Sequence, residues 1–369
     1  MVILTTGFVV SLLLTLWVVR RASDHHPERL GSLDHDLSGP QKFHEQPVPR
    51  VGGIGIFLAT GCALIGLAWT QPNLLGSALA VMACALPAFA AGLVEDLTKR
   101  VSPFWRLVFT GLSATLGALV LSAVINRTSI PGLDAIFQGA PWLAIGLTVF
   151  AVAGVANSLN IIDGFNGLAS MCAVLMLMSF GFVGFEVGDS LIVALALAGI
   201  GAILGFFVWN FPAGLIFLGD GGAYFLGFYV AELAILLVNR NPSVSPMFPM
   251  LVCIYPIFET VFSIYRRRVV RSHPAGMPDG IHLHSLVFRR VMRWASGRTQ
   301  DRSLTLRNSM TSPVLWLLCM LAVIPATLFW SNTPVLVFCI GVFVISYVLM
   351  YRSLVLFRTP RWLKRRKGR

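Results

Sequence analysis

The sequence predicts an all-α, polytopic integral membrane protein. Hydrophobic residues make up 56% of the chain and charged residues only 12%, whereas soluble domains carry roughly 25% charged residues. The mean hydropathy is +0.78. Long apolar runs recur along the chain, and several reach the roughly 20 residues that an α-helix needs to cross a bilayer. We therefore expect about 11 transmembrane helices in one lipid-embedded domain that covers residues 1–369.

The predicted spans follow the apolar runs in order. Two of them, 142–159 and 221–238, run directly into polar segments. The first span is expected to stay in the membrane, because Arg20 and Arg21 follow it as a cytoplasmic stop and no small-residue cleavage site is present. The expected spans are about 2–19, 51–70, 76–94, 105–125, 142–159, 168–186, 190–209, 221–238, 246–265, 313–330 and 335–357.

The distribution of basic residues predicts the orientation. All but two of the 28 lysines and arginines fall in alternate connections, and only Arg127 and Arg240 lie on the other side. Cytoplasmic connections collect Lys and Arg, so the N-terminus is expected to be periplasmic and the C-terminus cytoplasmic. The richest segments are a long cytoplasmic loop, 266–312, and a basic cytoplasmic tail, 358–369. The formal charge of +12 then reflects membrane topology and predicts no nucleic-acid partner.

The same topology places the histidines in the cytoplasmic connections and the cysteines within apolar runs. The cysteines show no CxxC or Cys/His spacing, so we expect packing residues and no disulfides. The histidines are His25, His26, His35, His44, His273, His282 and His284, and the cysteines are Cys62, Cys84, Cys172, Cys253, Cys319 and Cys339.

Glu95 and Asp96 close the third predicted span. Two adjacent carboxylates at a helix C-terminus face the unfavourable end of the helix dipole. Like charges side by side also raise one pKa, which suits a general base. The alternative interpretation is an interfacial cap paired with Lys99 or Arg100.

A second polar run closes the fifth span. Asn157, Asn160 and Asp163 are spaced i, i+3, i+6, which aligns them along one stripe of a helix. Asn166 follows between two glycines, which permit tight turns near a phosphate or a base. The stripe is suited to a polar ligand, and the alternative is a hydrogen-bonded joint between helices.

A third run leads from Asn210 to Asp220, at the start of the eighth span. Asp220 is flanked by glycines. A carboxylate there is a hard oxygen ligand suited to Mg²⁺ that is shared with substrate phosphates. The alternative is a simple helix N-cap, for which Asp is a preferred residue.

His282 and His284 form the fourth polar segment, in the 266–312 loop. No cysteine or third nearby histidine completes a zinc site, so a phosphate or sugar contact is the better interpretation, and the surrounding arginines suit a diphosphate. No Walker A loop, strand-linked GxGxxG or Ser-His-Asp arrangement appears in the sequence.

Taken together, the four segments resemble the polyprenyl-phosphate N-acetylhexosamine-1-phosphate transferases, glycosyltransferase family 4. This superfamily includes the bacterial enzymes that start peptidoglycan lipid I, O-antigen and enterobacterial common antigen. The resemblance extends from Pro49 to His284. In this comparison, the family's Asp-Asp pair falls on Glu95-Asp96, and its Gly-Asp metal motif falls on Gly219-Asp220. Its asparagine and histidine motifs fall on Asn157, Asn160, Asp163, Gly164, Asn166, Gly167, Asn210, His282 and His284.

The resemblance implies that a sugar-1-phosphate passes from a UDP-N-acetylhexosamine to undecaprenyl phosphate, with release of UMP. The site is then expected on the cytoplasmic face of the bacterial inner membrane. Mg²⁺, with Mn²⁺ as an alternative ion, is assigned to Asp220, and Asp96 with Glu95 to activation of the lipid phosphate. Asp163 completes the catalytic set, and the substrate-binding residues are Asn157, Asn160, Asn166, Asn210, His282, His284 and Lys99.

Three departures from the family pattern bear on the sugar. Glu95 replaces the usual first Asp, Ser285 replaces the last histidine of the motif, and Gly280 replaces a common arginine. The last two argue against the peptidoglycan enzyme and leave the sugar open among N-acetylglucosamine, N-acetylfucosamine and N-acetylgalactosamine. The pathway is expected to build a cell-surface polysaccharide of the O-antigen or capsule kind.

Two other classes of protein are weighed against the enzyme. A secondary transporter is expected to place its polar residues near the bilayer midplane and to show an inverted repeat. A scaffold is expected to scatter its polar residues over both faces. The sequence leaves a homodimer open.

Overall fold

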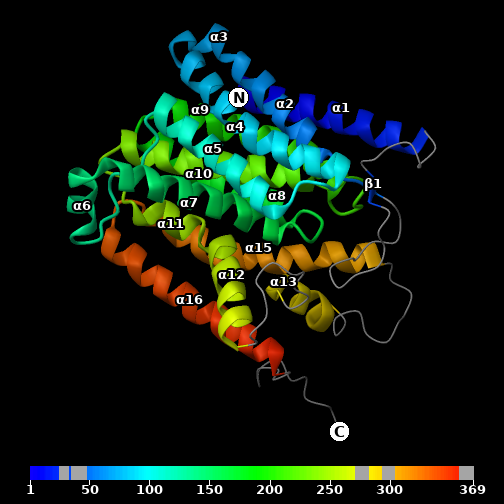
Figure 1. Cartoon of the computed structure of the whole chain (residues 1–369). Helices are drawn as coiled ribbons and strands as arrows, with labels where there is room; N and C mark the ends of the chain where they lie inside the picture. The colour runs from blue at the N-terminus through cyan, green and yellow to red at the C-terminus, as the bar shows by residue number, and fades with distance from the viewer. Residues whose placement is uncertain (25–32, 35–47, 271–281, 293–303, 357–369) are drawn as a thin grey trace.

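The protein is an assembly of long helices, described by a computed structural model over residues 1–24, 33–34, 48–270, 282–292 and 304–356 (Figure 1). A two-residue antiparallel pair joins β1 (Leu33–Asp34) to β2 (Val48–Pro49). The helices are α1 (Val2–Asp24), α2 (Gly52–Ile65), α3 (Leu67–Thr70), α4 (Pro72–Thr98), α5 (Pro103–Val120), α6 (Leu133–Gly139), α7 (Pro141–Ile162), α8 (Leu168–Glu186), α9 (Ser190–Asn210), α10 (Gly219–Arg240), α11 (Met247–Val252), α12 (Ile254–Tyr265), α13 (Leu283–Leu286), α15 (Leu304–Leu328) and α16 (Thr333–Val355).

The prediction of an all-α, multi-pass membrane protein is confirmed. Within the described residues, ten helices are long and apolar enough to cross a membrane. Prolines begin several of them, as at Pro72, Pro103 and Pro141, because a proline in the first turn loses no helical hydrogen bond. The six cysteines are free, as expected.

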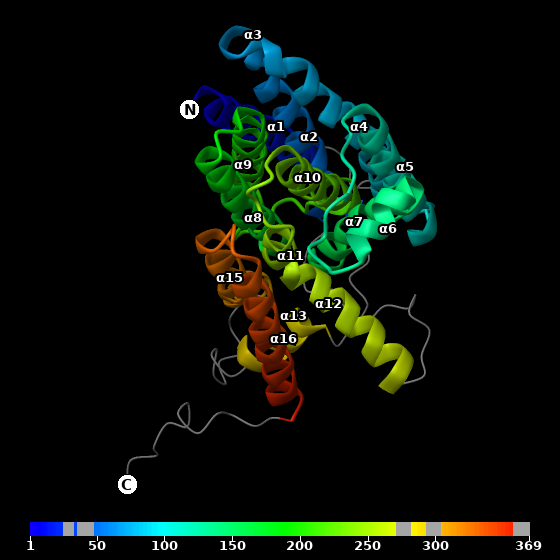
Figure 2. The same ribbon diagram turned by 90° about the vertical axis from the view of Figure 1, so that its left-hand side faces the viewer.

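The ninth of the eleven predicted spans, 246–265, was wrong as a single helix. It is divided at Cys253 into α11 and α12. Pro256 explains the break, because a proline has no N–H to donate to the carbonyl four residues earlier and its ring clashes with that carbonyl. The carbonyl concerned belongs to Val252, the last residue of α11. In Figure 2, α12 slants away from the helices around α10.

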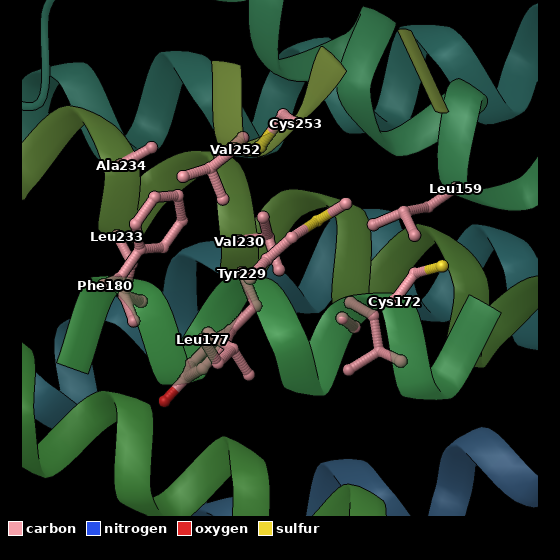
Figure 3. Packing of buried hydrophobic residues seen from close by; sticks show 14 of the residues in the cluster. Leu159, Cys172, Leu177, Phe180, Tyr229, Val230, Leu233, Ala234, Val252 and Cys253 are labelled. Carbon is pink, nitrogen blue, oxygen red and sulfur yellow. The ribbon is translucent and has the colours of Figure 1, made fainter. Parts of the chain in front are cut away.

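Helix α10 is the centre of the bundle and determines where its neighbours lie. Its membrane-spanning window is buried along its whole length, and it packs against α2, α4, α5, α7 and α8. A helix that is apolar all round is covered either by protein or by lipid, and α10 is covered by protein. Figure 3 shows its side chains interleaved with those of α7, α8 and the α11–α12 junction: Leu159, Cys172, Leu177, Phe180, Tyr229, Val230, Leu233, Ala234, Val252 and Cys253.

The segment expected as one long loop, 266–312, contains helical structure. Two π-helices, η2 (Arg266–Val270) and η3 (Val287–Met292), flank α13, and α15 begins at Leu304. The predicted loop was therefore too long. Polar residues that lie inside the protein, such as Asn308, made the first turns of α15 resemble a loop in the sequence. The basic tail 358–369 and His25, His26, His35, His44, His273 and Gly280 lie outside the described residues.

Gly92 sets the distance between α4 and the first turn of α10. A Cβ at this position would lie 2.6 Å from the backbone carbonyl of Asp220 and 2.6 Å from the nitrogen of Gly221. Backbone atoms cannot move aside as a flexible side chain can, so the two helices approach this closely only because residue 92 is glycine.

We expect Gly92→Ala to destabilise the protein, by about 1–3 kcal/mol as is usual for overpacking. The measurement is thermal unfolding of the purified protein in detergent. Gly76→Ala is the matched control, because Gly76 lies in the same helix with no atom within 4 Å of the added Cβ. Equal melting temperatures for the two variants would contradict the close-approach argument.

Candidate functional site

One cavity of about 450 Å³ brings members of all four polar segments together. They come from the C-terminal ends of α4, α7 and α9, the first turn of α10, and α13. Its polar wall is formed by Arg50, Glu95, Arg106, Asn160, Asp163, Asn166, Asn210, Asp220, His282, His284, Ser285 and Asn308. Three of the sequence-predicted site residues, Asp96, Asn157 and Lys99, do not line it.

Asp96 lies beneath the cavity wall and caps α10. Its side chain is 1% exposed. Oδ1 accepts the backbone N–H of Asp220 at 2.9 Å, and Oδ2 accepts that of Gly221 at 2.8 Å. The unpaired N–H groups at a helix N-terminus favour a negative charge, so Asp96 fixes the start of the helix that carries Asp220. The sequence did not indicate this role.

Gly219 makes the contact between Asp96 and α10 sterically feasible. Its φ is +76°, and a Cβ here would lie 2.0 Å from the carbonyl oxygen of Arg50 and 2.6 Å from Oδ2 of Asp96. Only glycine combines the left-handed backbone with this space.

Glu95 faces the cavity, unlike its neighbour Asp96. Its Oε2 accepts the backbone N–H of Val101 at 2.7 Å, which ties the α4–α5 connection to the site. Lys99 is exposed and ends α4 in a left-handed conformation, with φ 56°. The structure therefore separates the adjacent acids into one wall residue and one helix cap.

Asp220 is the most heavily contacted carboxylate of the cavity. It lies in the first turn of α10, one residue inside the helix start, and is not the N-cap. Its Oδ1 accepts from Nδ2 of Asn160 at 2.8 Å and lies 3.7 Å from Nη2 of Arg50. Its Oδ2 accepts from Nη1 of Arg106. Two arginines thus balance this carboxylate, while Asn160 orients it from α7.

Asp163, the residue that ends α7, shares the cavity with Asp220. Its pKa is raised to about 8, chiefly by burial; the charge of Arg50 opposes this rise, and the carboxylates of Asp220 and Asp96 add to it. A carboxyl with this pKa retains its proton at neutral pH unless a cation approaches.

The remaining asparagines hold the backbone around the cavity. Asn210 accepts the N–H of Gly167 at 2.6 Å and donates to the carbonyl of Ile216 at 2.7 Å. Asn166 donates through its backbone N–H to Oδ1 of Asn308 at 2.9 Å. For Asn166 this is the joining contact that was the alternative interpretation of the second polar run, and the side chains of Asn166 and Asn210 also reach the cavity.

Asn157 is half-buried on α7 and lies outside the cavity. Its Oδ1 accepts a long hydrogen bond of 3.4 Å from the hydroxyl of Tyr224 on α10. The predicted stripe is therefore divided, with Asn160 and Asp163 at the cavity and Asn157 deeper between the helices.

His282 and His284 lie on the cavity wall with their rings stacked, at a centroid distance of 5.1 Å and an angle of 14°. His284 also meets the ring of Phe165 edge-on at 5.4 Å. Nδ1 of His282 lies 3.0 Å from Oε1 of Glu259, a buried acid on α12. The two stacked imidazoles lie on the cavity wall, where their ring nitrogens can contact anionic oxygens.

Sequence reasoning missed Arg50, Arg106, Asn308 and Glu259. Arg50 and Arg106 were assigned only to membrane topology. A signal was present for Arg106, because an arginine in the first turn of a helix opposes the dipole. Glu259 is an isolated acid in an apolar run, which in a membrane protein is itself a functional signal.

The cavity residues fit a magnesium ion by the chemistry of their donors. Asp220 and Asp163 offer carboxylate oxygens from two separate elements, and Asn160 adds an amide. Within the described residues no group of three or more His, Cys, Asp or Glu side chains is arranged around one point. Mg²⁺ commonly takes one or two carboxylates together with water and substrate phosphates, so the donor set is sufficient.

Carboxylates, amides and arginines at the ends of membrane-spanning helices define a membrane-embedded enzyme that acts on phosphate groups. Residues 78–238 match the model of glycosyl transferase family 4. This match and the relatives described next support the superfamily of polyprenyl-phosphate sugar-phosphate transferases.

Individual relatives agree with this assignment. The "Probable undecaprenyl-phosphate N-acetylglucosaminyl 1-phosphate transferase" of Bacillus subtilis is 28% identical over 77% of this chain and 77% of its own length. An "Undecaprenyl-phosphate alpha-N-acetylglucosaminyl 1-phosphate transferase" of Thermotoga maritima is 29% identical over 70% of this chain and 74% of its own. A "Phospho-N-acetylmuramoyl-pentapeptide-transferase" of Streptococcus thermophilus is 38% identical, but over only 32% of this chain and 34% of its own.

We expect Asp96→Asn to lower the free energy of unfolding by about 1.5–3 kcal/mol, the usual contribution of a hydrogen bond to a charged group. The amide keeps one acceptor oxygen and turns an NH₂ group toward the second backbone N–H. Thermal unfolding in detergent measures the change. Glu186→Gln is the control, because Glu186 is an exposed acid at the end of α8. A variant as stable as wild type would contradict the capping role.

Proposed function

We propose that this protein transfers N-acetylhexosamine-1-phosphate from a UDP-sugar to undecaprenyl phosphate and releases UMP. The observation that carries the proposal is the single cavity in which the motif residues Asp163, Asp220 and His282 meet Arg50 and Arg106. Carboxylates for a divalent cation and arginines for phosphate oxygens are what a reaction between a diphosphate and a phosphate requires.

The chemistry is an in-line displacement at phosphorus. An oxygen of the lipid phosphate attacks the phosphorus that carries the sugar, a new P–O bond forms, and the bond to the UMP oxygen breaks. Such transfers depend mainly on positioning and electrostatic stabilisation. Arg50 and Arg106 are placed to neutralise phosphate oxygens, and His282 and His284 contact the diphosphate or the sugar from the opposite segment of the wall.

The proposal assigns a divalent cation to Asp220 and Asp163. Mg²⁺, or Mn²⁺ in its place, supplies neutralisation of the diphosphate and stabilisation of the UMP leaving group when bound. Arg106 and Arg50 contact Asp220, so phosphate oxygens bound next to this carboxylate would meet both arginines. Glu95 is the acid on the wall that remains for orienting the lipid phosphate, while Asp96 acts through the backbone of α10.

The sugar is proposed to be N-acetylglucosamine. The two relatives named for that sugar match 70% or more of this chain, whereas the match to the pentapeptide enzyme of Streptococcus thermophilus covers about a third. The site is proposed to face the cytoplasm of the bacterial inner membrane, because UDP-sugars are cytoplasmic and the basic connections lie on that side. The product then starts a cell-surface polysaccharide.

We expect Asp220→Asn to reduce Mg²⁺-dependent UMP release by at least about a hundredfold, a loss typical of removing one preorganised electrostatic group. The variant should remain folded, since the amide oxygen can still accept from Asn160 and from Arg106. UMP release and thermal unfolding are measured on the same preparation, with Glu186→Gln as the control. Near-normal release by Asp220→Asn would refute the metal assignment.

The direct test uses purified protein, undecaprenyl phosphate and a panel of UDP-sugars, with UMP as the readout. The panel contains the UDP forms of N-acetylglucosamine, N-acetylgalactosamine, N-acetylfucosamine and N-acetylmuramoyl-pentapeptide. We expect release with N-acetylglucosamine, loss of release on chelation with EDTA, and recovery with added Mg²⁺ or Mn²⁺. UMP release with another UDP-sugar alone would replace N-acetylglucosamine as the proposed sugar. UMP release with none of the UDP-sugars would overturn the proposal.

A further inference from the structure

Glu259 on α12 is a buried acid for which the reaction outlined above has no use. Its side chain is 1% exposed, and both of its oxygens have partners. Oε1 accepts the backbone N–H of Leu283 at 3.0 Å and lies 3.0 Å from Nδ1 of His282. Oε2 accepts the hydroxyl of Tyr347, on α16, at 2.6 Å.

We propose that Glu259 is a positioning residue for His282, which holds the Nδ1–H of the imidazole and so directs Nε2 toward the substrate cavity. The inference rests on the proposed function, because it treats this cavity as the place where substrate binds. It assigns no direct contact between Glu259 and substrate.

The chemistry of the two partners fixes the proton on one ring nitrogen. A carboxylate can only accept a hydrogen bond, so Nδ1 of His282 carries a proton whether the ring is neutral or charged. The nitrogen that changes state is then Nε2, on the far side of the ring from Glu259. Acidic partners fix the tautomer and orientation of functional histidines in the same way at metal sites.

The surrounding contacts make Glu259 a rigid support. Oε1 holds both the His282 ring and the N–H of Leu283, the first residue of α13, so the ring and its backbone are fixed together. Tyr347 fixes the other oxygen from α16. His284 stacks on His282, so the orientation of one ring also restrains the next.

Burying Glu259 costs free energy, which supports a specific role for this acid. An acid removed from water is costly unless it is well hydrogen-bonded, and Glu259 receives three such contacts from two further elements. Glu232, on α10, is a useful contrast. It is 0% exposed, and neither of its oxygens has a hydrogen-bond partner among the described residues. Both residues are buried glutamates, but among the described residues Glu259 has a cavity histidine as a partner and Glu232 has none.

The experiment combines ¹⁵N NMR of histidine-labelled protein with UMP-release kinetics. The His282 resonances are identified by their loss in His282→Ala. Wild type is expected to show one tautomer with the proton on Nδ1. Glu259→Leu, which has no acceptor, should lose that single tautomer and lower kcat by about 10–100-fold. Glu259→Gln, which keeps an acceptor oxygen, should restore the tautomer and most of the rate. Glu232→Leu is the matched control and should leave both readouts unchanged.

A double-mutant cycle separates positioning from general stability. If Glu259 acts through His282, Glu259→Leu should cost no further kcat in the His282→Ala background. An equal loss in both backgrounds, or an unchanged His282 tautomer in Glu259→Leu, overturns the proposal. If Glu259→Leu does not fold, Tyr347→Phe replaces it in the same cycle, with a smaller loss of kcat expected and the same criterion applied.

Failure of the proposed function is distinguishable from failure of this inference. If wild type releases no UMP with any sugar nucleotide, the reaction is wrong, and the NMR comparison alone then decides whether Glu259 fixes the ring.

Discussion

The site depends on one interaction, the capping of α10 by Asp96. The acid at the end of α4 receives two backbone N–H groups from the first turn of α10, which aligns the C-terminus of one spanning helix with the N-terminus of another. The C-terminal end of the α4 dipole disfavours a carboxylate, and the N-terminal end of the α10 dipole favours it. Asp220 is itself one of the two capped residues, so its carboxylate reaches the cavity from a fixed backbone.

The packing of α10 provides the stiffness that this contact needs. Helices in lipid associate through close contact of small residues more than through exclusion of water. Gly92 on α4 lies against the first turn of α10, and Gly53 on α2 lies against Gly222. Because α10 is enclosed along its length, a shift at either contact moves Asp220 relative to Asn160 and Arg106. The packing of the helices therefore determines the geometry of the site in this protein.

Composition and periodicity were enough to predict the membrane class and most spans, because a bilayer imposes one length on every crossing. They failed at 246–265, where Pro256 interrupts the helix although the hydropathy is continuous. Four polar segments were enough to predict where the cavity forms. The sequence could not divide the roles of Glu95 and Asp96, since adjacent residues on a helix point in different directions and only packing decides which one is buried. It also could not pair Glu259 with His282, because they lie on separate elements 23 residues apart. The orientation of the termini stays a prediction.

The charges of the cavity residues determine which substrates the cavity can attract. Glu95, Asp220 and Asp163 bring carboxyl groups to the wall and Asp96 lies beneath it, while Arg50 and Arg106 bring two positive charges, and burial raises the pKa of Asp163 to about 8. A cavity of this kind does not attract a diphosphate and a lipid phosphate by its own charge, since each substrate adds further negative charge. The divalent cation of the proposed function would supply the positive charge that both substrates need. Asp220 and Asp163 would hold this cation, and Arg50 and Arg106 would contact phosphate oxygens. The excess of acids over arginines is therefore consistent with a site whose charge becomes complementary to substrate only when the cation and the nucleotide are bound together.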